Sequence, residues 1–350
     1  MGSVKRNRPD EPEKSFFRSE FEWVRGPKLG SGGFGSVYLA TVKKPKLGCE
    51  GFPTVMAVKT FSEWSEQATE SSYLYLFRDC PYVIGSYGKN LTIGDDGYVK
   101  YNVFLEYADG GTIGDLIKKS GGSGLCESDV RNYTKAILSG LEYIHESGYV
   151  HCDLKPENIL LVTSSSGFVP KIGDFGLAKT AMQKLTCQGT SMYLSPEAVC
   201  CRVQEQPSDI WALGCVVLRM LMGRQPWEAK HGSKLDEPEP LVASKVPNIP
   251  AWLSDDAKDF LGKCLVRDPF ERSTAAELLN HQFVTKLDVV GKVEPVEEVA
   301  SESSSEQYGS FIPLESWNSE EAEDFGPILP VALLNPRPVI PSTVYQRAST

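Results

Sequence analysis

Along this chain of 350 residues, hydrophobic and polar positions alternate in some stretches, as in a strand, and recur at helical spacing in others. Stretches rich in β-branched and aromatic residues predict strands at residues 28–40, 55–59 and 103–108. Residues 63–77 have helical character, and apolar residues recur at helical spacing through residues 129–148. Gly148 is a suitable end for that second helix. The pattern predicts strands and one helix early in the chain, with a long amphipathic helix after them.

Several connections are also predicted from turn-forming residues. We expect a long loop at residues 43–53, a strand pair that starts at residues 80–84 with its turn at 90–97, and a Ser-rich loop at 163–170. Residues 208–215 begin a strongly apolar helix, which Ser208 or Asp209 could cap.

Charge and composition separate a central body from two polar ends. Residues 1–21 are polar and predict a flexible segment, and from residue 285 onward eleven Asp or Glu face four Lys or Arg, so −7 of the net −10 lies there. Residues 286–350 therefore predict a largely disordered tail, acidic at first and then rich in Pro and apolar residues. That last part suggests a docking peptide for a regulatory partner or for the chain's own body, although an inert tail is equally consistent.

The nine cysteines are scattered, with no C-x-x-C pair, which argues against a disulfide framework and for a reducing compartment. No apolar run reaches the roughly 18 residues of a membrane span. Basic residues do not interleave with aromatic ones, so we expect neither nucleic acid nor a membrane as partner. We expect a cytoplasmic protein, and the basic cluster at residues 4–8 is a candidate nuclear signal.

Residues 151–161, HCDLKPENILL, carry the strongest chemical signal. Asp153 can accept a hydroxyl proton, Lys155 can neutralise a moving phosphoryl group, and Asn158 can hold a metal. We expect the loop to be a β-hairpin tip that aims these three groups at one point, followed by a buried strand from Ile159 to Val162.

A glycine-rich turn near the start of the body adds a phosphate-binding signal. Gly30, Gly32 and Gly35 match G-x-G-x-x-G, where glycines let backbone N–H groups approach phosphates closely. A Rossmann turn would need a helix directly after the glycines. Val37 and its neighbours instead continue as a strand, so the stretch predicts a hairpin that covers a nucleotide.

Taken in order, these stretches resemble the motifs of protein kinases. Residues 151–158 resemble the catalytic loop, with Cys152 where Arg is usual; residues 57–59 resemble V-A-I-K; residues 174–176 match D-F-G; and residues 195–197 are a variant of A-P-E. The resemblance implies an α+β, bilobal protein kinase fold over residues 22–285, with a small β-rich N-lobe carrying one helix, a large helical C-lobe and disordered termini.

The resemblance also implies ATP and Mg²⁺ as cofactors and assigns residues to them. Asn158 and Asp174 would hold Mg²⁺, and Lys59 would reach the α- and β-phosphates. Glu63, Glu66 and Glu70 compete to pair with Lys59, and we choose Glu70 because Leu74 follows one turn later on the same face. The residues assigned to the nucleotide are Leu29, Gly30, Ser31, Gly32, Gly33, Phe34, Gly35, Val37, Ala57, Lys59, Glu70, Glu106, Ala108 and Leu160.

Catalysis is assigned to Asp153, Lys155, Asn158 and Thr190, and the last of these favours a Ser/Thr kinase over a tyrosine kinase. Glu197 is expected to pair with Arg272 in a buried ion pair. The resemblance makes residues 177–195 the activation segment. Cys152 departs from the family because the usual Arg there pairs with a phosphate on this segment. We therefore hypothesise that this chain does not need that phosphate.

The chain looks most like plant mitogen-activated protein kinase kinase kinases of the MEKK-like group. That resemblance implies transfer of the ATP γ-phosphate to a MAP kinase kinase in stress or hormone signalling. The main alternative is a pseudokinase that serves as a scaffold in the same cascade, and a kinase of tyrosine or of small molecules is a second. Lys59, Asp153, Asn158 and Asp174 are all present, which argues against the pseudokinase.

Overall fold

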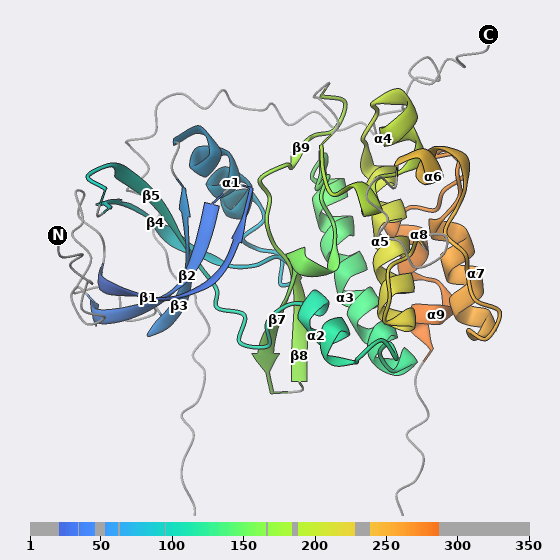
Figure 1. Cartoon of the computed structure of the whole chain (residues 1–350), viewed down its shortest axis with the longest axis horizontal. Helices are drawn as coiled ribbons and strands as arrows, with labels where there is room; N and C mark the ends of the chain where they lie inside the picture. Colours follow the sequence, from blue (N-terminus) through green and yellow to red (C-terminus); the bar gives the residue numbers. More distant parts are fainter. Residues whose placement is uncertain are drawn as a thin grey trace, which may run out of the picture. The chain divides into compact units, whose positions relative to one another are not determined.

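The computed structural model describes residues 21–33, 35–45, 53–61, 64–94, 96–165, 167–183, 188–227 and 239–286. The predicted terminal segments lie outside these ranges, apart from Phe21 and Lys286 at their inner ends. Figure 1 shows a β-sheet with one helix on one side of the molecule and a group of helices on the other. The predicted two-lobed α+β architecture is confirmed. Over the described ranges, no helix has the length and apolar character needed to cross a membrane.

The small lobe is an antiparallel sheet of five strands in the order β1-β2-β3-β5-β4. Its strands are β1 (Phe21–Gly32), β2 (Gly35–Pro45), β3 (Val55–Phe61), β4 (Ser86–Ile93) and β5 (Val99–Leu105). Side chains of β3 alternate between two cores. Met56 and Val58 pack with Trp23 on one face, whereas Ala57 and Phe61 join the main core on the other. Lys59 has the same parity as Ala57, so its side chain lies on the main-core face.

The single helix of this lobe is α1 (Trp64–Leu76). Glu70 and Leu74 stand one turn apart on the same face, and both are almost fully buried, at 2% and 1% exposure. Phe77, directly after the helix, is fully buried and packs against Phe175 of the large lobe. The predicted spacing therefore places one charged group and one apolar group of α1 into the region between the lobes.

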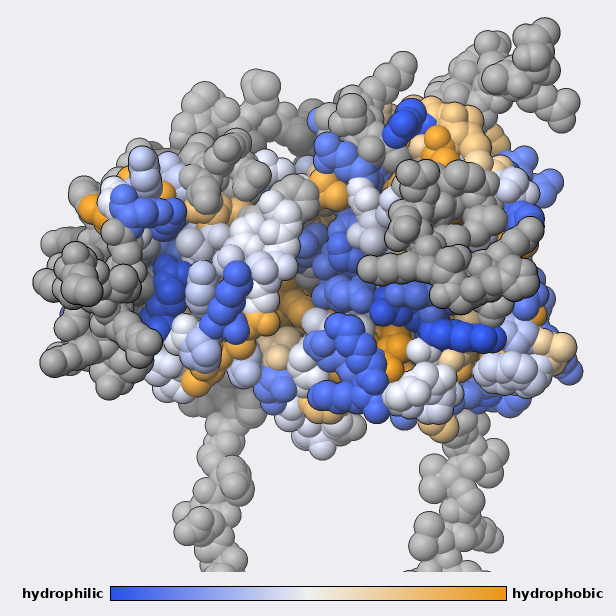
Figure 2. All heavy atoms as spheres, in the orientation of Figure 1, coloured by the Kyte–Doolittle hydropathy of each residue, from blue (hydrophilic) through white to orange (hydrophobic). Residues whose placement is uncertain are grey.

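The large lobe surrounds α5 (Gln206–Met222), in which every residue from Ser208 to Met222 is buried. The other helices are α2 (Ile113–Lys119), α3 (Glu127–Glu146), α4 (Pro196–Cys201), α6 (Glu239–Ser244), α7 (Asp255–Cys264), α8 (Ala275–Leu279) and α9 (Gln282–Thr285). The N-cap of α5 is Glu205, not Ser208 or Asp209 as predicted, because both predicted caps lie inside the first turn. Figure 2 shows polar residues over much of the face in view, with small apolar areas between them.

Four short strands carry the polar loops of the large lobe: β6 (Tyr149–Val150), β7 (Ile159–Ser164), β8 (Gly167–Ile172) and β9 (Lys179–Thr180). The prediction of a hairpin tip at residues 151–158 was wrong, because β6 pairs with β9 and β7 pairs with β8. The predicted Ser-rich loop at residues 163–170 is instead mostly strand. Pro170 is tolerated there because a two-stranded ribbon has free edges.

The predicted strand at residues 80–84 is also wrong. Cys80 and Tyr82 lie in a turn, and Val83 forms a single bridge to Ile172 before β4 begins at Ser86. The apolar residues of this stretch are buried by packing on the core and not by a sheet, which periodicity alone cannot separate in so short a run. The predicted turn is also shorter than expected, because β4 continues to Ile93.

A buried ion pair joins α4 to the loop before α8. Arg272 donates to both carboxylate oxygens of Glu197, at 2.8 and 3.0 Å, and both residues are 5% exposed. The remaining Arg272 N–H groups donate to backbone oxygens of Pro207 and Val266. The pair thus fixes the end of the activation segment to the rest of the large lobe.

Removing one partner should leave the other charged and buried. We expect Arg272→Met to lower the free energy of unfolding by about 3–5 kcal/mol in urea titrations. Lys258→Met is the control, since its partner Asp255 is 98% exposed and such pairs contribute about 0–1 kcal/mol. Equal losses in both variants would contradict a structural role for the buried pair.

Candidate active site

The loop from His151 to Asn158 is held by one carboxylate of α5. Asp209, 1% exposed, accepts hydrogen bonds from the backbone N–H groups of His151 (2.8 Å) and Cys152 (3.0 Å), and its Oδ2 lies 2.9 Å from His145 Nε2. Cys152 adopts φ +68°, a conformation that a non-glycine residue rarely takes. The loop therefore leaves β6 with a sharp turn that the carboxylate stabilises.

His151 links this loop to the strand that ends in Asp174. Its buried ring lies 3.1 Å from the carbonyl oxygen of Gly173 through Nε2, and Nδ1 accepts from the N–H of Asp153 at 3.3 Å. A carbonyl only accepts and an N–H only donates, so the proton of this ring is on Nε2. Phe175 is fully buried and packs against the same ring, with the two ring centroids 5.1 Å apart.

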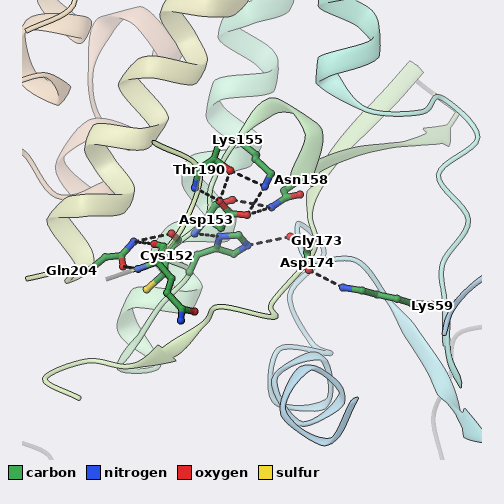
Figure 3. Close-up of polar contacts among 11 residues, drawn as sticks. Lys59, Cys152, Asp153, Lys155, Asn158, Gly173, Asp174, Thr190 and Gln204 are labelled. Carbon is green, nitrogen blue, oxygen red and sulfur yellow. Dashed lines mark hydrogen bonds and ion pairs between the residues drawn. The ribbon is translucent and has the colours of Figure 1, made fainter. Parts of the chain in front are cut away.

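Four predicted catalytic residues meet around the carboxylate of Asp153 (Figure 3). Lys155 Nζ lies 2.5 Å from Asp153 Oδ2 and donates to Thr190 Oγ1 at 2.9 Å. The N–H and hydroxyl of Thr190 both donate to Asp153 Oδ1, each at 2.9 Å. Asn158 Nδ2 donates to the backbone oxygen of Asp153 at 2.9 Å and to Oδ2 at 3.2 Å. The loop therefore places the carboxylate of Asp153, a proton acceptor, next to the ammonium group of Lys155.

A second cluster of charged side chains joins the two lobes. Lys59 Nζ lies 2.6 Å from Glu70 Oε2 and 2.7 Å from Asp174 Oδ1. Burial would lower the pKa of Lys59, but the charges of Glu70 and Asp174 raise it above its ordinary value. Burial would likewise raise the pKa of Asp174, and the charge and hydrogen bond of Lys59 bring it below the ordinary value. Lys59 is therefore protonated and Asp174 ionised at neutral pH.

Asp174 and Asn158 are the residues predicted to hold Mg²⁺. The backbone N–H of Gly173 donates to the carbonyl oxygen of Asn158 at 2.9 Å, so the two metal-binding candidates lie on connected segments. Asp174 has φ +60°, a strained conformation that is concentrated at functional sites. A carboxylate and an amide supply the hard oxygen atoms that Mg²⁺ prefers, and a nucleotide would supply the others.

The glycine-rich turn forms the predicted hairpin between β1 and β2, with Gly30 opposite Val37 and Gly32 opposite Gly35. A Cβ added to Gly30, Gly32 or Gly33 would meet no atom within 4 Å, so the backbone there is open to a phosphate. Gly35 differs: it has φ +137°, and a Cβ would lie 2.4 Å from the carbonyl oxygen of Thr60. Phe34 lies outside the described residues.

Three apolar residues assigned to the nucleotide, Val37, Ala57 and Leu160, belong to one apolar cluster or pack against it. Ala57 and Leu105 belong to the main core and pair across β3 and β5, while Val37 and Leu160 pack against that core. Leu29 is 45% exposed and Ser31 follows it near the tip of the hairpin. The cluster offers an apolar surface beside the open glycine backbone.

The segment after β5 presents backbone groups. The N–H of Glu106 donates to Gly85 and the carbonyl of Ala108 accepts from Gly111. In the part of the chain that the structure describes, the C=O of Glu106 and the N–H of Ala108 make no hydrogen bond. One acceptor and one donor two residues apart are complementary to the edge of a purine. The apolar surface, the open glycines and the oxygen ligands together fit an ATP·Mg²⁺ complex.

Sequence reasoning missed three sets of polar partners. The Glu106 carboxylate pairs with Lys171 at 2.8 Å, and Arg219 of α5 donates to the Tyr193 hydroxyl and to Glu157. Gln204 and Glu205 contact the activation segment. These residues form no motif and lie up to 65 positions from their partners, so the only available signal was a charged residue inside an apolar helix, as at Arg219.

Comparison with known proteins agrees with this geometry. Residues 23–284 match the family model of the protein kinase domain. The chain is 41% identical to mitogen-activated protein kinase kinase kinase 20 of Arabidopsis thaliana over 275 residues, which cover 75% of this chain and 78% of that protein. Kinase kinase kinases 17 and 18 of the same plant are each 38% identical, and the matches cover 75% of this chain and 70% and 77% of those proteins.

The two kinds of glycine in the hairpin should respond differently to a methyl group. We expect Gly35→Ala to lower the melting temperature by several degrees, because positive φ and the contact with Thr60 cost about 1–3 kcal/mol. Gly32→Ala, the matched control, has open space and should leave the melting temperature unchanged. Equal melting temperatures for both variants, measured by circular dichroism, would contradict this distinction.

Proposed function

The chain belongs to the protein kinase family, and on that premise we propose that it acts as a mitogen-activated protein kinase kinase kinase. It would transfer the ATP γ-phosphate to serine or threonine hydroxyls of a downstream MAP kinase kinase. The observation that carries this proposal is the set of contacts around Asp153, in which Lys155 and Thr190 meet one carboxylate. A substrate hydroxyl at this position would find a proton acceptor in Asp153, and Lys155 would supply a positive charge for the phosphoryl group.

The nucleotide side of the reaction depends on Lys59. Glu70 holds its ammonium group in place and keeps it charged, so that it can bind the α- and β-phosphates. Asp174 and Asn158 would hold Mg²⁺, which supplies charge neutralisation for the phosphate oxygens when bound. The open backbone at Gly30, Gly32 and Gly33 would cover the phosphates, and the C=O of Glu106 and the N–H of Ala108 would bind the base.

The acceptor side depends on Asp153. Its carboxylate orients the substrate hydroxyl and accepts its proton, while Lys155 stabilises the negative charge that develops on the transferred group. Thr190 fixes the carboxylate through two hydrogen bonds from the activation segment. Because the acceptor, the cation and the segment share these bonds, an ordered segment and an ordered catalytic loop require one another.

The cellular setting remains part of the proposal. The names of the relatives support a role in a MAP kinase cascade, and we propose stress or hormone signalling, a cytoplasmic location and entry into the nucleus through residues 4–8. The tail from residue 286 would bind a regulatory partner. A pseudokinase scaffold is the second candidate, but the contacts of Lys59, Asp153 and Asp174 favour an active enzyme.

Two conservative substitutions test the assignment. We expect Asp153→Asn and Lys59→Met to lower transfer of phosphate to a generic Ser/Thr protein by about 10²–10⁴-fold, because each removes a group that acts in the transition state. The assay uses the full chain with ATP and Mg²⁺, and EDTA should abolish transfer. Asp255→Asn and Lys258→Met, which change an exposed pair of α7, are the matched controls. Unchanged transfer in Asp153→Asn would contradict the mechanism.

Phosphorylation of the activation segment should matter little. Cys152 has no charge with which to hold a phosphate, so we expect Thr180→Ala combined with Thr186→Ala to keep transfer within about threefold of the wild type. Thr180 is exposed at the end of β9, and Thr186 lies outside the described residues. Thr190→Ala should lose activity in the same assay and shows that the assay responds to this segment. A loss of more than tenfold in the double variant would refute the hypothesis.

A further inference from the structure

Two neighbouring residues at the start of α5 turn their side chains toward the activation segment. Gln204, 9% exposed, and Glu205, whose side chain is 17% exposed, follow Arg202, which ends α4 with φ +57°. Glu205 is also the N-cap of α5, and its backbone N–H donates to Ser208 Oγ at 3.2 Å. Both residues therefore lie directly before α5, whose residues Ser208 to Met222 are buried.

Glu205 binds the first half of the segment through both carboxylate oxygens. Oε1 lies 2.8 Å from Nζ of Lys179 in β9, and Oε2 accepts from the backbone N–H of Met182 at 3.0 Å. Lys179 is 5% exposed and also donates to the carbonyl oxygen of Gln183 at 3.1 Å. A buried lysine needs a compensating anion, and here Glu205 of the same chain supplies it.

Gln204 binds the second half of the segment and the catalytic loop together. Its Nε2 donates to the carbonyl oxygen of Cys152 at 2.8 Å and to that of Gln188 at 3.1 Å. Its Oε1 accepts from the N–H of Gln188 at 3.4 Å. Figure 3 shows the amide of Gln204 beside Cys152, one residue before Asp153. The catalytic loop and the segment are thus joined through one uncharged side chain.

One of these contacts reaches Cys152, the residue where the chain departs from its family. An Arg at position 152 would join the catalytic loop to a segment phosphate, whereas Cys152 is buried and its sulfur lies 3.7 Å from the carbonyl of Val150. In this chain other groups replace both the negative charge of that phosphate and the link between the catalytic loop and the segment. Glu205 provides a fixed negative charge for Lys179, and Gln204 provides the connection between loop and segment.

We propose that Gln204 and Glu205 form a clamp that holds the activation segment against the catalytic loop without a phosphate. They are positioning residues for the proposed phosphoryl transfer, because they fix Thr190 and Asp153 through the segment and the loop. The inference rests on the proposed function, but the clamp itself is a property of the fold and is measurable without substrate.

The first experiment follows hydrogen exchange of the full chain by mass spectrometry. In Glu205→Gln the peptide containing the Met182 amide should exchange about tenfold or more faster, and in Gln204→Leu the same should hold for Gln188. Glu271→Gln and Gln282→Leu change exposed residues of the same two types and should leave both peptides unchanged. Unchanged exchange in both clamp variants would overturn the proposal, whatever substrate the chain acts on.

The second experiment measures transfer on the same four variants and the wild type, with melting temperatures to confirm folding. Each clamp variant should lower kcat about tenfold or more while the KM for ATP stays within about twofold, since Lys59 and Glu70 are untouched. A clamp variant that keeps full kcat while the wild type is active would overturn the positioning role. Should the wild type itself transfer no phosphate, the proposed function fails, and the exchange data still decide the clamp.

A double-mutant cycle separates loss of the Glu205–Lys179 interaction from a general loss of folding in Glu205→Gln. Lys179→Met and Glu205→Gln remove the two ends of one interaction, so the double variant should lose no more kcat than the worse single variant. Losses that multiply would show that Glu205 and Lys179 act independently, which contradicts the clamp.

Discussion

The arrangement of the active site depends on one buried carboxylate, that of Asp209. Burial would raise its pKa, but hydrogen bonds from His145 and from the backbone N–H of His151 hold the pKa below the ordinary range, so the group is ionised. In this state it accepts from two successive N–H groups and stabilises the positive φ of Cys152. This turn lies between His151 and Asp153, so the positions of both side chains depend on it.

The contacts that begin at Asp209 continue to two other parts of the active site. His151 lies 3.1 Å from the carbonyl oxygen of Gly173 and packs on Phe175, so Asp174 between them, the residue proposed to hold Mg²⁺, is positioned by the same loop that carries Asp153. On the other side, the clamp residues Gln204 and Glu205, directly before α5, reach the activation segment and the catalytic loop. Because α5 is buried from Ser208 to Met222, it is a rigid anchor for the residues directly before it.

The sequence predicted best the features that have a fixed spacing. Glu70 was selected from three candidates because Leu74 follows one turn later, and the structure brings Glu70 to Lys59. It fails where the partner of a strand has to be chosen: the spacing of Asp153, Lys155 and Asn158 predicts a hairpin tip, whereas the strands on either side of this loop pair with β9 and β8 and not with each other. The contacts of Gln204 and Glu205 go to backbone groups and to one lysine, which leave no periodicity or motif to detect.

We propose that this active site is assembled by the fold and not by phosphorylation. The most direct measurement is the time course of transfer by protein that has been treated with a phosphatase, purified from it and verified as unphosphorylated by mass spectrometry. We expect full velocity from the first turnover, with no lag at any enzyme concentration. A lag that shortens as the enzyme concentration rises, with phosphate appearing on the activation segment, would contradict it.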